Sequence, residues 1–283
     1  MNDLQQKELE LLEVFVDLCE KLDLPYYLVC GSALGAVKYG GFIPWDDDVD
    51  VGLLRSDYET FLDRVPALLP DGFFLQTWKS DPNYPQVFAK LRNSNTTYIE
   101  KSASSLDINH GIYIDIFPLD WYPSGKREQR RLEKQKLWYK RFLACNFTYE
   151  SGFGRKIACS AFRFLGLNKK NAAVMTRYER VVAQYTADSS TILCNHGNWQ
   201  GKREYAPEEQ YGKGTAAEFE GLRVRIPERY DEYLTQKYGD WRMDLPKEQQ
   251  VGHHYCAVCD TQRPYTAYID SAANGRIKVK LPK

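Results

Sequence analysis

Long hydrophobic runs are missing from this sequence, and so is an excess of charge of either sign. No apolar stretch approaches the roughly 20 residues that a membrane-spanning helix needs. Lys and Arg number 38, as do Asp and Glu, so the overall field favours neither nucleic acid nor a membrane surface. The seven cysteines are odd in number and irregularly spaced, which argues against a disulfide framework and favours a reducing compartment. The acidic, amphipathic N-terminal stretch is unlike a signal peptide. We therefore expect a cytoplasmic protein, at most peripheral at the inner face of the cell membrane.

The neutral average conceals one basic segment. From Gly125 to Lys170 there are thirteen Lys or Arg against three Glu, a net charge of +10. Within it, "RKIACSAFRFLGL" sets basic residues beside apolar ones, a pattern that suits an amphipathic helix on anionic lipid and equally a solvated face over a helical core. We expect possible peripheral membrane contact through 125–170. No motif that reads DNA or RNA accompanies these charges, so nucleic acid is not an expected partner.

Helix and strand patterns intermingle over the first 120 residues. We expect a turn at Gly31-Ser32 before a short helix, and Ser56 as an N-cap. Expected helices cover 4–22, 56–69, 125–187 and 227–238, and expected strands cover 26–30, 48–54, 73–78, 87–93, 112–117 and 222–226. The fold class is α/β (α+β), a mixed sheet with flanking helices plus a helical elaboration. Its expected parts are a catalytic core at 1–123, a basic helical insertion at 124–190, and a C-terminal part at 191–283 that completes the core and the acceptor side.

Four aspartates crowd into five positions in "WDDDVDVG". On a strand, Asp46, Asp48 and Asp50 would point to one face and Asp47 to the other. Carboxylates spaced some 6–7 Å apart along a strand can converge on one or two hard cations, and Mg²⁺ prefers such oxygen ligands. The sequence therefore predicts a metal site.

Two other interpretations of the aspartates are less consistent with the sequence. A solvated acidic turn would not continue straight into the apolar run that begins at Val49. A calcium loop needs Gly where Val51 stands and Glu where Asp57 stands.

A further carboxylate interrupts the apolar run "HGIYIDIF". Asp115, between two isoleucines, would be costly to bury unless it is paired or bound to metal. A salt-bridged strand residue is the alternative. Asp120 follows Pro118 and is expected in a turn.

Taken together, these features resemble the nucleotidyltransferase fold, and more narrowly the LicD family. The resemblance rests on "GSALGAVKYGGFIPWDDDVDVGL", "FAKLRNSNTTYIE", "GIYIDIFPLD" and "FEGLRVRIPERYDEYLTQKYGDW" in that order. It covers most of the chain and is weakest over 124–190 and the last 30 residues. It implies transfer of phosphocholine from CDP-choline to a sugar hydroxyl of a cell-surface glycan precursor (teichoic acid, capsule or lipopolysaccharide). Relatives such as the fukutin-related group use other CDP-linked donors, which keeps phosphoglycerol or phosphoribitol transfer open.

The same resemblance assigns roles. Asp48 and Asp50 would be paired ligands of Mg²⁺, or of Mn²⁺, with Asp46 extending the cluster. Asp115 would be the third carboxylate, as a ligand or as the base for the incoming hydroxyl. Gly31 and Ser32 would approach the phosphates of the donor, and the acceptor would be a glycan or a lipid-linked glycan.

Lys90 and Arg92 lie two apart in "VFAKLRNS" and would share one strand face, which suits a pyrophosphate. Exposed charges on an edge strand are the alternative. Trp45 and Tyr98 suit stacking on cytosine or contact with choline, although lone aromatic residues usually serve packing.

Weaker signals leave other functions open. The segment "GHHYCAVCD" offers His253, His254, Cys256 and Cys259, half of a zinc site to which Cys194 and His196 could contribute. A packed segment whose histidines line the acceptor side is the expected interpretation. Rival functions are a nucleotidyltransferase using CTP or ATP, a glycosyltransferase and a catalytically inactive scaffold.

Overall fold

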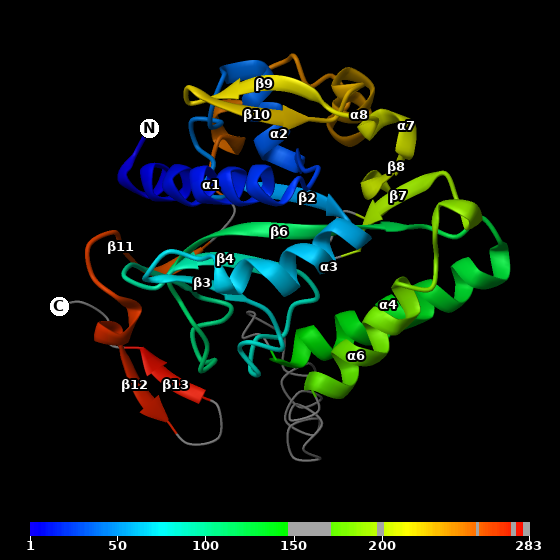
Figure 1. The fold of residues 1–283 in the computed structure, drawn as a ribbon. Coiled ribbons are helices and arrows are strands. Elements are labelled where there is room, and N and C mark those ends of the chain that lie inside the picture. The colour runs from blue at the N-terminus through cyan, green and yellow to red at the C-terminus, as the bar shows by residue number, and fades with distance from the viewer. Residues whose placement is uncertain (147–170, 197–200, 253–254, 273–275, 280–283) are drawn as a thin grey trace.

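The computed structural model describes residues 1–146, 171–196, 201–252, 255–272 and 276–279 (Figure 1). Helices and strands alternate from α1 to β3, strands β4 to β6 follow directly, and then come a pair of helices and several short strands. This mixed sheet with flanking helices confirms the predicted fold class. Part of the predicted helical insertion, 147–170, lies outside the described residues.

The main sheet has seven strands. Five follow the order β1-β2-β6-β4-β3, while β7 pairs with β6 and β8 pairs with β7. β2 and β6 are parallel, and the other pairs are antiparallel. The strands span Tyr27–Leu28 (β1), Asp50–Leu54 (β2), Phe73–Gln76 (β3), Ala89–Asn93 (β4), Ile112–Trp121 (β6), Ile192–Asn195 (β7) and Tyr205–Pro207 (β8). The sheet thus joins strands from both ends of the chain.

Strand β6 changes partners along one edge. Its first half pairs with β4 as far as Ile116, and its last residues pair with β7 from Leu119 onward. Pro118 lies between these two ladders, where its missing N–H breaks no hydrogen bond on that edge. The strand therefore runs past the proline, and the prediction that Asp120 lies in a turn is wrong. Asp120 is a strand residue that is 1% exposed.

The two faces of β6 differ in character because successive side chains alternate. One face carries a row of buried isoleucines and then Asp120, and the other carries Tyr113 and Asp115. The isoleucines are Ile112, Ile114 and Ile116. A charge on the second face therefore lies apart from the apolar packing on the first.

Helices α1 (Asp3–Leu22) and α3 (Arg55–Arg64) cover the isoleucine face. Arg55, at the start of α3, forms a two-bond ion pair with Asp120, both bonds 2.7 Å long. Phe15 of α1 and Phe61 of α3 meet at 5.3 Å between ring centroids. Helix α1 confirms the predicted helix at 4–22. Helix α3 begins one residue before Ser56 and has no side-chain cap, so the predicted N-cap is wrong; the short helix η1 (Val65–Ala67) follows.

The opposite side of the sheet carries a second group of elements. They are α2 (Cys30–Tyr39), η4 (Gly201–Glu204), α7 (Glu208–Tyr211), the hairpin of β9 (Thr215–Phe219) and β10 (Leu222–Ile226), and α8 (Tyr230–Tyr238). Figure 1 shows α2, the hairpin and α8 gathered together. Gly31 and Ser32 lie inside the first turn of α2, not in a turn before it. Helix α8 ends at Gly239, as predicted.

Helices α4 (Lys126–Asn146) and α6 (Asn171–Val182) lie side by side below the sheet (Figure 1). They share a second hydrophobic core in which Tyr139 and Tyr178 meet at 4.8 Å. These helices confirm the helical expectation for 126–146 and 171–182, but α6 ends at Val182, so the expected continuation to 187 is wrong. Four strands that the sequence did not indicate form two pairs, β5 (Thr97–Glu100) with β11 (Cys256–Asp260) and β12 (Ile269–Ala272) with β13 (Arg276–Val279).

Candidate active site

Two buried aspartates face each other across neighbouring strands. Asp50 of β2 and Asp115 of β6 are direct partners in the parallel ladder, and they are 8% and 5% exposed. The backbone N–H of Asp50 donates to Ser32 Oγ at 2.8 Å, which fixes the start of β2 against α2. The pKa of the Asp50 carboxyl lies well above its usual range, because burial and then the carboxylates of Asp48 and Asp115 disfavour its charged form. A cation bound nearby would reduce the repulsion between these two carboxylates.

Lys90 brings one positive charge to this pair. It lies opposite Asp115 on β4, and its Nζ is 3.0 Å from Asp115 Oδ1 and 3.7 Å from Glu100 Oε2. The ammonium also lies 3.2 Å from the centre of the Tyr113 ring. Lys90 is 4% exposed, so one buried lysine serves two carboxylates. The structure therefore brings together two predicted site residues, Lys90 and Asp115.

Arg92 shares the strand face of Lys90 but is engaged elsewhere. Its guanidinium donates to the carbonyl oxygen of Gly111 at 2.6 Å and to Gln76 Oε1 at 2.5 Å. The residue is 1% exposed. These bonds hold the loop before β6 against β3 and β4. A contact between Arg92 and the phosphates of a donor stays a prediction.

A loop of three acidic residues precedes Asp50. Oxygens of Asp46, Asp47 and Asp48 all lie within 4.8 Å of one another, and the three side chains are half-buried. The expectation that Asp47 points away from its neighbours is wrong, because β2 begins only at Asp50 and the strand alternation does not extend to the loop. Sequence reasoning therefore missed Asp47 as a member of the cluster.

The acidic loop is held by its surroundings. Gln5 of α1 donates from Nε2 to the carbonyl oxygen of Asp46 at 3.0 Å. A Cβ atom on Gly31 would lie 2.7 Å from Asp46 Oδ2, so only glycine allows this carboxylate to approach α2 so closely. Ser32 is 4% exposed. The structure brings Gly31 and Ser32 to the carboxylates, and their contact with donor phosphates stays a prediction.

The two aromatic candidates flank the loop. The hydroxyl of Tyr98 is 3.5 Å from Asp47 Oδ2, and burial raises the pKa of this phenol. The ring of Trp45 meets that of Tyr39 edge-on at 6.4 Å. Contact of Trp45 or Tyr98 with cytosine or choline stays a prediction.

Near Asp50 lies a group of buried residues that the sequence did not suggest. Burial raises the pKa of the Cys30 thiol, while the nearby Lys237 ammonium lowers it and the Asp50 carboxylate raises it further. Lys237 forms an ion pair with Glu204 in which both side chains are at most 4% exposed. The backbone N–H of Cys30 donates to Tyr233 Oη at 3.1 Å. A lysine in "YLTQKYG" would ordinarily be assigned to the solvent face of a helix, so no sequence signal indicated its burial.

The side chains fit a hard divalent cation. All the ligands offered at this site are carboxylate oxygens, which Mg²⁺ and Mn²⁺ prefer. The pKa of Asp50 is raised by burial and then by repulsion from Asp48 and Asp115, and a cation would relieve that repulsion. Within the described ranges, Asp46, Asp47 and Asp48 are the group of three or more candidate ligands that converge.

The cysteine and histidine candidates do not converge in the described part of the chain. Cys194 Sγ is 3.1 Å from His196 Nε2, at the end of β7, whereas Cys256 and Cys259 lie on β11. The nearby His253 and His254 are outside the described residues. Zinc binding by Cys256 and Cys259 stays a prediction.

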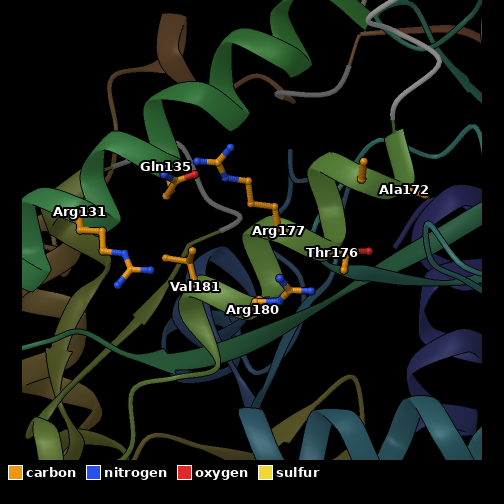
Figure 2. A pocket seen from close by; sticks show the side chains of 8 residues that line it. Arg131, Gln135, Ala172, Thr176, Arg177, Arg180 and Val181 are labelled. Carbon is orange, nitrogen blue, oxygen red and sulfur yellow. The ribbon is translucent and has the colours of Figure 1, made fainter.

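A separate cavity of about 580 Å³ lies between α4 and α6 (Figure 2). Arg131 and Gln135 line it from α4, and Arg177 and Arg180 line it from α6. None of its lining residues belongs to the carboxylate site. In the described ranges, no helix combines the length and apolar character required to cross a membrane.

Comparison with known proteins places this site in a family. Residues 23–153 match the family model described as LicD/FKTN/FKRP, nucleotidyltransferase domain. These residues include strands β1 to β6, the acidic loop and Lys90. The lipopolysaccharide cholinephosphotransferase LicD of Haemophilus influenzae is 29% identical over 256 residues, which cover 87% of this chain and 92% of that protein.

Two shorter matches are to uncharacterized proteins. One from Rickettsia typhi is 33% identical over 72 residues, covering 24% of this chain and 23% of that protein. One from Rickettsia prowazekii is 38% identical over 55 residues, covering 18% of this chain and 21% of that protein. The domain match therefore assigns residues 23–153 to the LicD/FKTN/FKRP nucleotidyltransferase domain family, and the similarity to the Haemophilus protein extends over most of the chain.

Proposed function

We propose that this protein transfers phosphocholine from CDP-choline to a sugar hydroxyl of a cell-surface glycan precursor, with a divalent metal ion. One structural observation carries the proposal: Asp50 and Asp115 oppose each other in one ladder, next to the acidic loop 46–48 and beside Lys90. The similarity to the Haemophilus cholinephosphotransferase over most of both chains supports the choline head group and the glycan acceptor.

The chemistry is a displacement at phosphorus. The acceptor hydroxyl oxygen forms a bond to the phosphorus that carries choline, and the bond from that phosphorus to the bridging oxygen breaks, so that CMP leaves with the electron pair. The proton of the hydroxyl passes to a carboxylate, and Asp115 is suited to accept it. Lys90, 3.0 Å from Asp115, orients this carboxylate and balances its charge.

The metal-binding role falls to the neighbouring carboxylates. Asp48 and Asp50 would hold Mg²⁺ or Mn²⁺, with Asp46 extending the set and Asp47 available beside it. A bound cation supplies positive charge to the non-bridging oxygens of the diphosphate. Gly31, in the first turn of α2, lets the carboxylate of Asp46 lie close to the backbone. Ser32 fixes Asp50 through the backbone of β2.

A lipid-linked acceptor would make contact with a membrane useful, and α4 has the side chains for it. Leu137 and Trp138 are 50% and 54% exposed on this basic helix. Lys and Arg beside exposed apolar residues are typical of helices that lie on anionic lipid. The arginines in Figure 2 extend the basic surface onto α6. We infer that the described part of 125–170 contributes to this contact.

The first test is thermal unfolding of the purified protein with Mg²⁺ and a panel of nucleotides. The panel contains CDP-choline, CDP-glycerol, CDP-ribitol, UDP-glucose, CTP and ATP, each repeated with EDTA. A ligand at a hundred times its Kd adds about 2.7 kcal/mol to the stability of the native state. We expect CDP-choline alone to raise the Tm, and only without EDTA.

Each other result points to a different function. Stabilisation by CDP-glycerol or CDP-ribitol would change the head group, whereas stabilisation by CTP or ATP would indicate a nucleotidyltransferase. A response to UDP-glucose would indicate a glycosyltransferase. A matched Asp50→Asn variant distinguishes binding at the carboxylates from binding elsewhere, because it should lose the Mg²⁺-dependent shift.

A further inference from the structure

The cavity between α4 and α6 is lined by hydrogen-bond donors that carry positive charge. Arg131, Arg177 and Arg180 supply three guanidinium groups (Figure 2). Gln135 adds a side-chain amide and Thr176 a hydroxyl, and none of the described residues that line the cavity has a carboxylate. The volume of about 580 Å³ lies in the range of about 300–1,000 Å³ that small-molecule sites occupy. The cavity is therefore large enough for a ligand, and its charge selects an anion.

One face of each helix builds this cavity. Arg131 and Gln135 are four residues apart on α4, and Ala173, Arg177 and Arg180 repeat at helical spacing on α6. The short side chain of Ala173 leaves space between the longer ones. Apolar side chains of both helices pack together in the second hydrophobic core. That core fixes the two helices relative to each other and so holds the arginines around one space.

The three acidic side chains on the described parts of α4 and α6 contact groups outside the cavity. Glu133 accepts a hydrogen bond of 2.6 Å from Tyr205 Oη, and Glu179 accepts one of 2.7 Å from Trp78 Nε1. The third, Glu128, lies against the backbone just before α4. The carboxylates that are nearest in sequence to the arginines of the cavity are thus engaged with other partners.

Within the described ranges, the three arginines of the cavity form no ion pair. Arg177 and Arg180 are three residues apart on α6, a spacing at which like charges are neighbours and repel. A bound anion would relieve this repulsion. A guanidinium group donates through a rigid planar fork that matches two oxygens of a phosphate. We propose that this cavity binds a phosphate or diphosphate group through Arg131, Arg177 and Arg180.

The surroundings of the cavity connect this site to the proposed membrane contact. Trp138 follows Arg131 by seven residues and Gln135 by three, so it shares their face of α4, and it is 54% exposed. A phosphate on a lipid headgroup would meet the arginines with an aromatic side chain beside them, whereas a soluble diphosphate would use the arginines alone. The inference extends the proposed contact of α4 with a membrane, and it depends neither on the metal ion nor on choline transfer.

The experiment titrates the purified protein with sodium pyrophosphate by isothermal calorimetry in the presence of EDTA, which keeps divalent ions from the carboxylate site. The test variant is Arg177→Gln/Arg180→Gln, and both side chains are exposed, so the Tm should stay that of the wild type. We expect its affinity for pyrophosphate to fall by about 100-fold, about tenfold for each charged hydrogen-bond donor lost.

A matched control removes the same charge outside the cavity. Arg127→Gln/Arg130→Gln changes two exposed arginines of α4 that do not line it. This variant should keep its affinity for pyrophosphate within about threefold, because exposed charges that do not contact the ligand are screened by salt. If the wild-type protein does not bind pyrophosphate, or if the cavity variant binds it as tightly as the control variant, the anion site is overturned. The response to CDP-choline with Mg²⁺ is a separate measurement, so the proposed function stands or falls independently.

A second arm identifies the source of the phosphate. Both variants are sedimented with vesicles of phosphatidylcholine, with and without phosphatidic acid. A greater loss of binding to phosphatidic acid for Arg177→Gln/Arg180→Gln than for Arg127→Gln/Arg130→Gln supports a lipid headgroup in the cavity. An equal loss, together with weakened pyrophosphate binding by the cavity variant alone, supports a soluble phosphate or diphosphate.

Discussion

Replacing Lys90 with methionine should destabilise the protein strongly, and Mg²⁺ should offset part of the loss. The substitution keeps the approximate length of the side chain but removes an ammonium that lies within 4 Å of both Asp115 and Glu100. Those carboxylates are on side chains that are 8% and 19% exposed. Removing one partner of a buried pair typically costs about 3–5 kcal/mol, because the remaining charge cannot return to water.

The expected size of the effect follows from the size of the chain. For a protein larger than about 150 residues, each kcal/mol shifts the Tm by about 2–4 °C, so we expect a fall of about 10 °C in EDTA. Added Mg²⁺ should stabilise Lys90→Met more than it stabilises the wild type, because a cation on the neighbouring carboxylates replaces the missing positive charge. Calorimetry with and without Mg²⁺ measures both quantities.

A control separates this effect from the general loss of an ion pair. Lys21 pairs with Asp17 on the exposed face of α1, where both side chains are more than half exposed. Lys21→Met should cost at most about 0.5 kcal/mol. If the Tm of Lys90→Met equals the Tm of Lys21→Met and of the wild type, Lys90 does not neutralise the buried carboxylates, and its role as the partner of Asp115 must be abandoned.

Three further predictions concern neighbouring groups. Asp50→Asn should raise the Tm of the metal-free protein, because it removes a buried carboxylate that is repelled by two others, and a lower Tm would contradict this account. The same variant should abolish transfer, which is measured by product formation. Asp120→Asn should cost about 3–5 kcal/mol by leaving Arg55 buried beside a neutral group, with Mn²⁺ affinity retained; denaturant unfolding gives the cost. Burial lowers the pKa of His196 to about 4, so the native state resists protonation while the unfolded state takes up a proton below about pH 6.5. Stability from this group should therefore be complete above pH 6.5 and fall by up to about 3 kcal/mol towards pH 4, and His196→Gln should flatten that slope.

Much of the site could be predicted because carboxylates stand out in strands that are otherwise apolar. Asp115 interrupts an apolar run and Asp50 stands where one begins, and a carboxylate in such a position indicates a special role whether or not the neighbouring strand is known. Their direct pairing in the ladder could not be predicted, because it depends on register between strands that are some sixty residues apart.

The errors have local physical causes. Asp47 was assigned to the wrong face because the alternation of a strand was extended into an irregular loop. Asp120 was assigned to a turn because Pro118 usually ends a strand, whereas here it lies where β6 changes partners. Lys237 is the residue that sequence reasoning had least reason to find, because its burial depends on an ion pair with Glu204, which is distant in the chain.

The first turn of α1 is hydrogen-bonded to the acidic loop, so its exchange behaviour depends on whether that loop is ordered. Gln5 accepts a hydrogen bond from the backbone of Asn2 in the capping box, and the same side chain donates to the carbonyl oxygen of Asp46. The end of a helix normally frays on a fast timescale. Here its opening must break a bond to the loop that carries the proposed ligands. Amide hydrogen exchange at Gln5 and Gln6 should therefore slow when a cation orders that loop, which makes this remote helix end a probe of occupancy that needs no substrate.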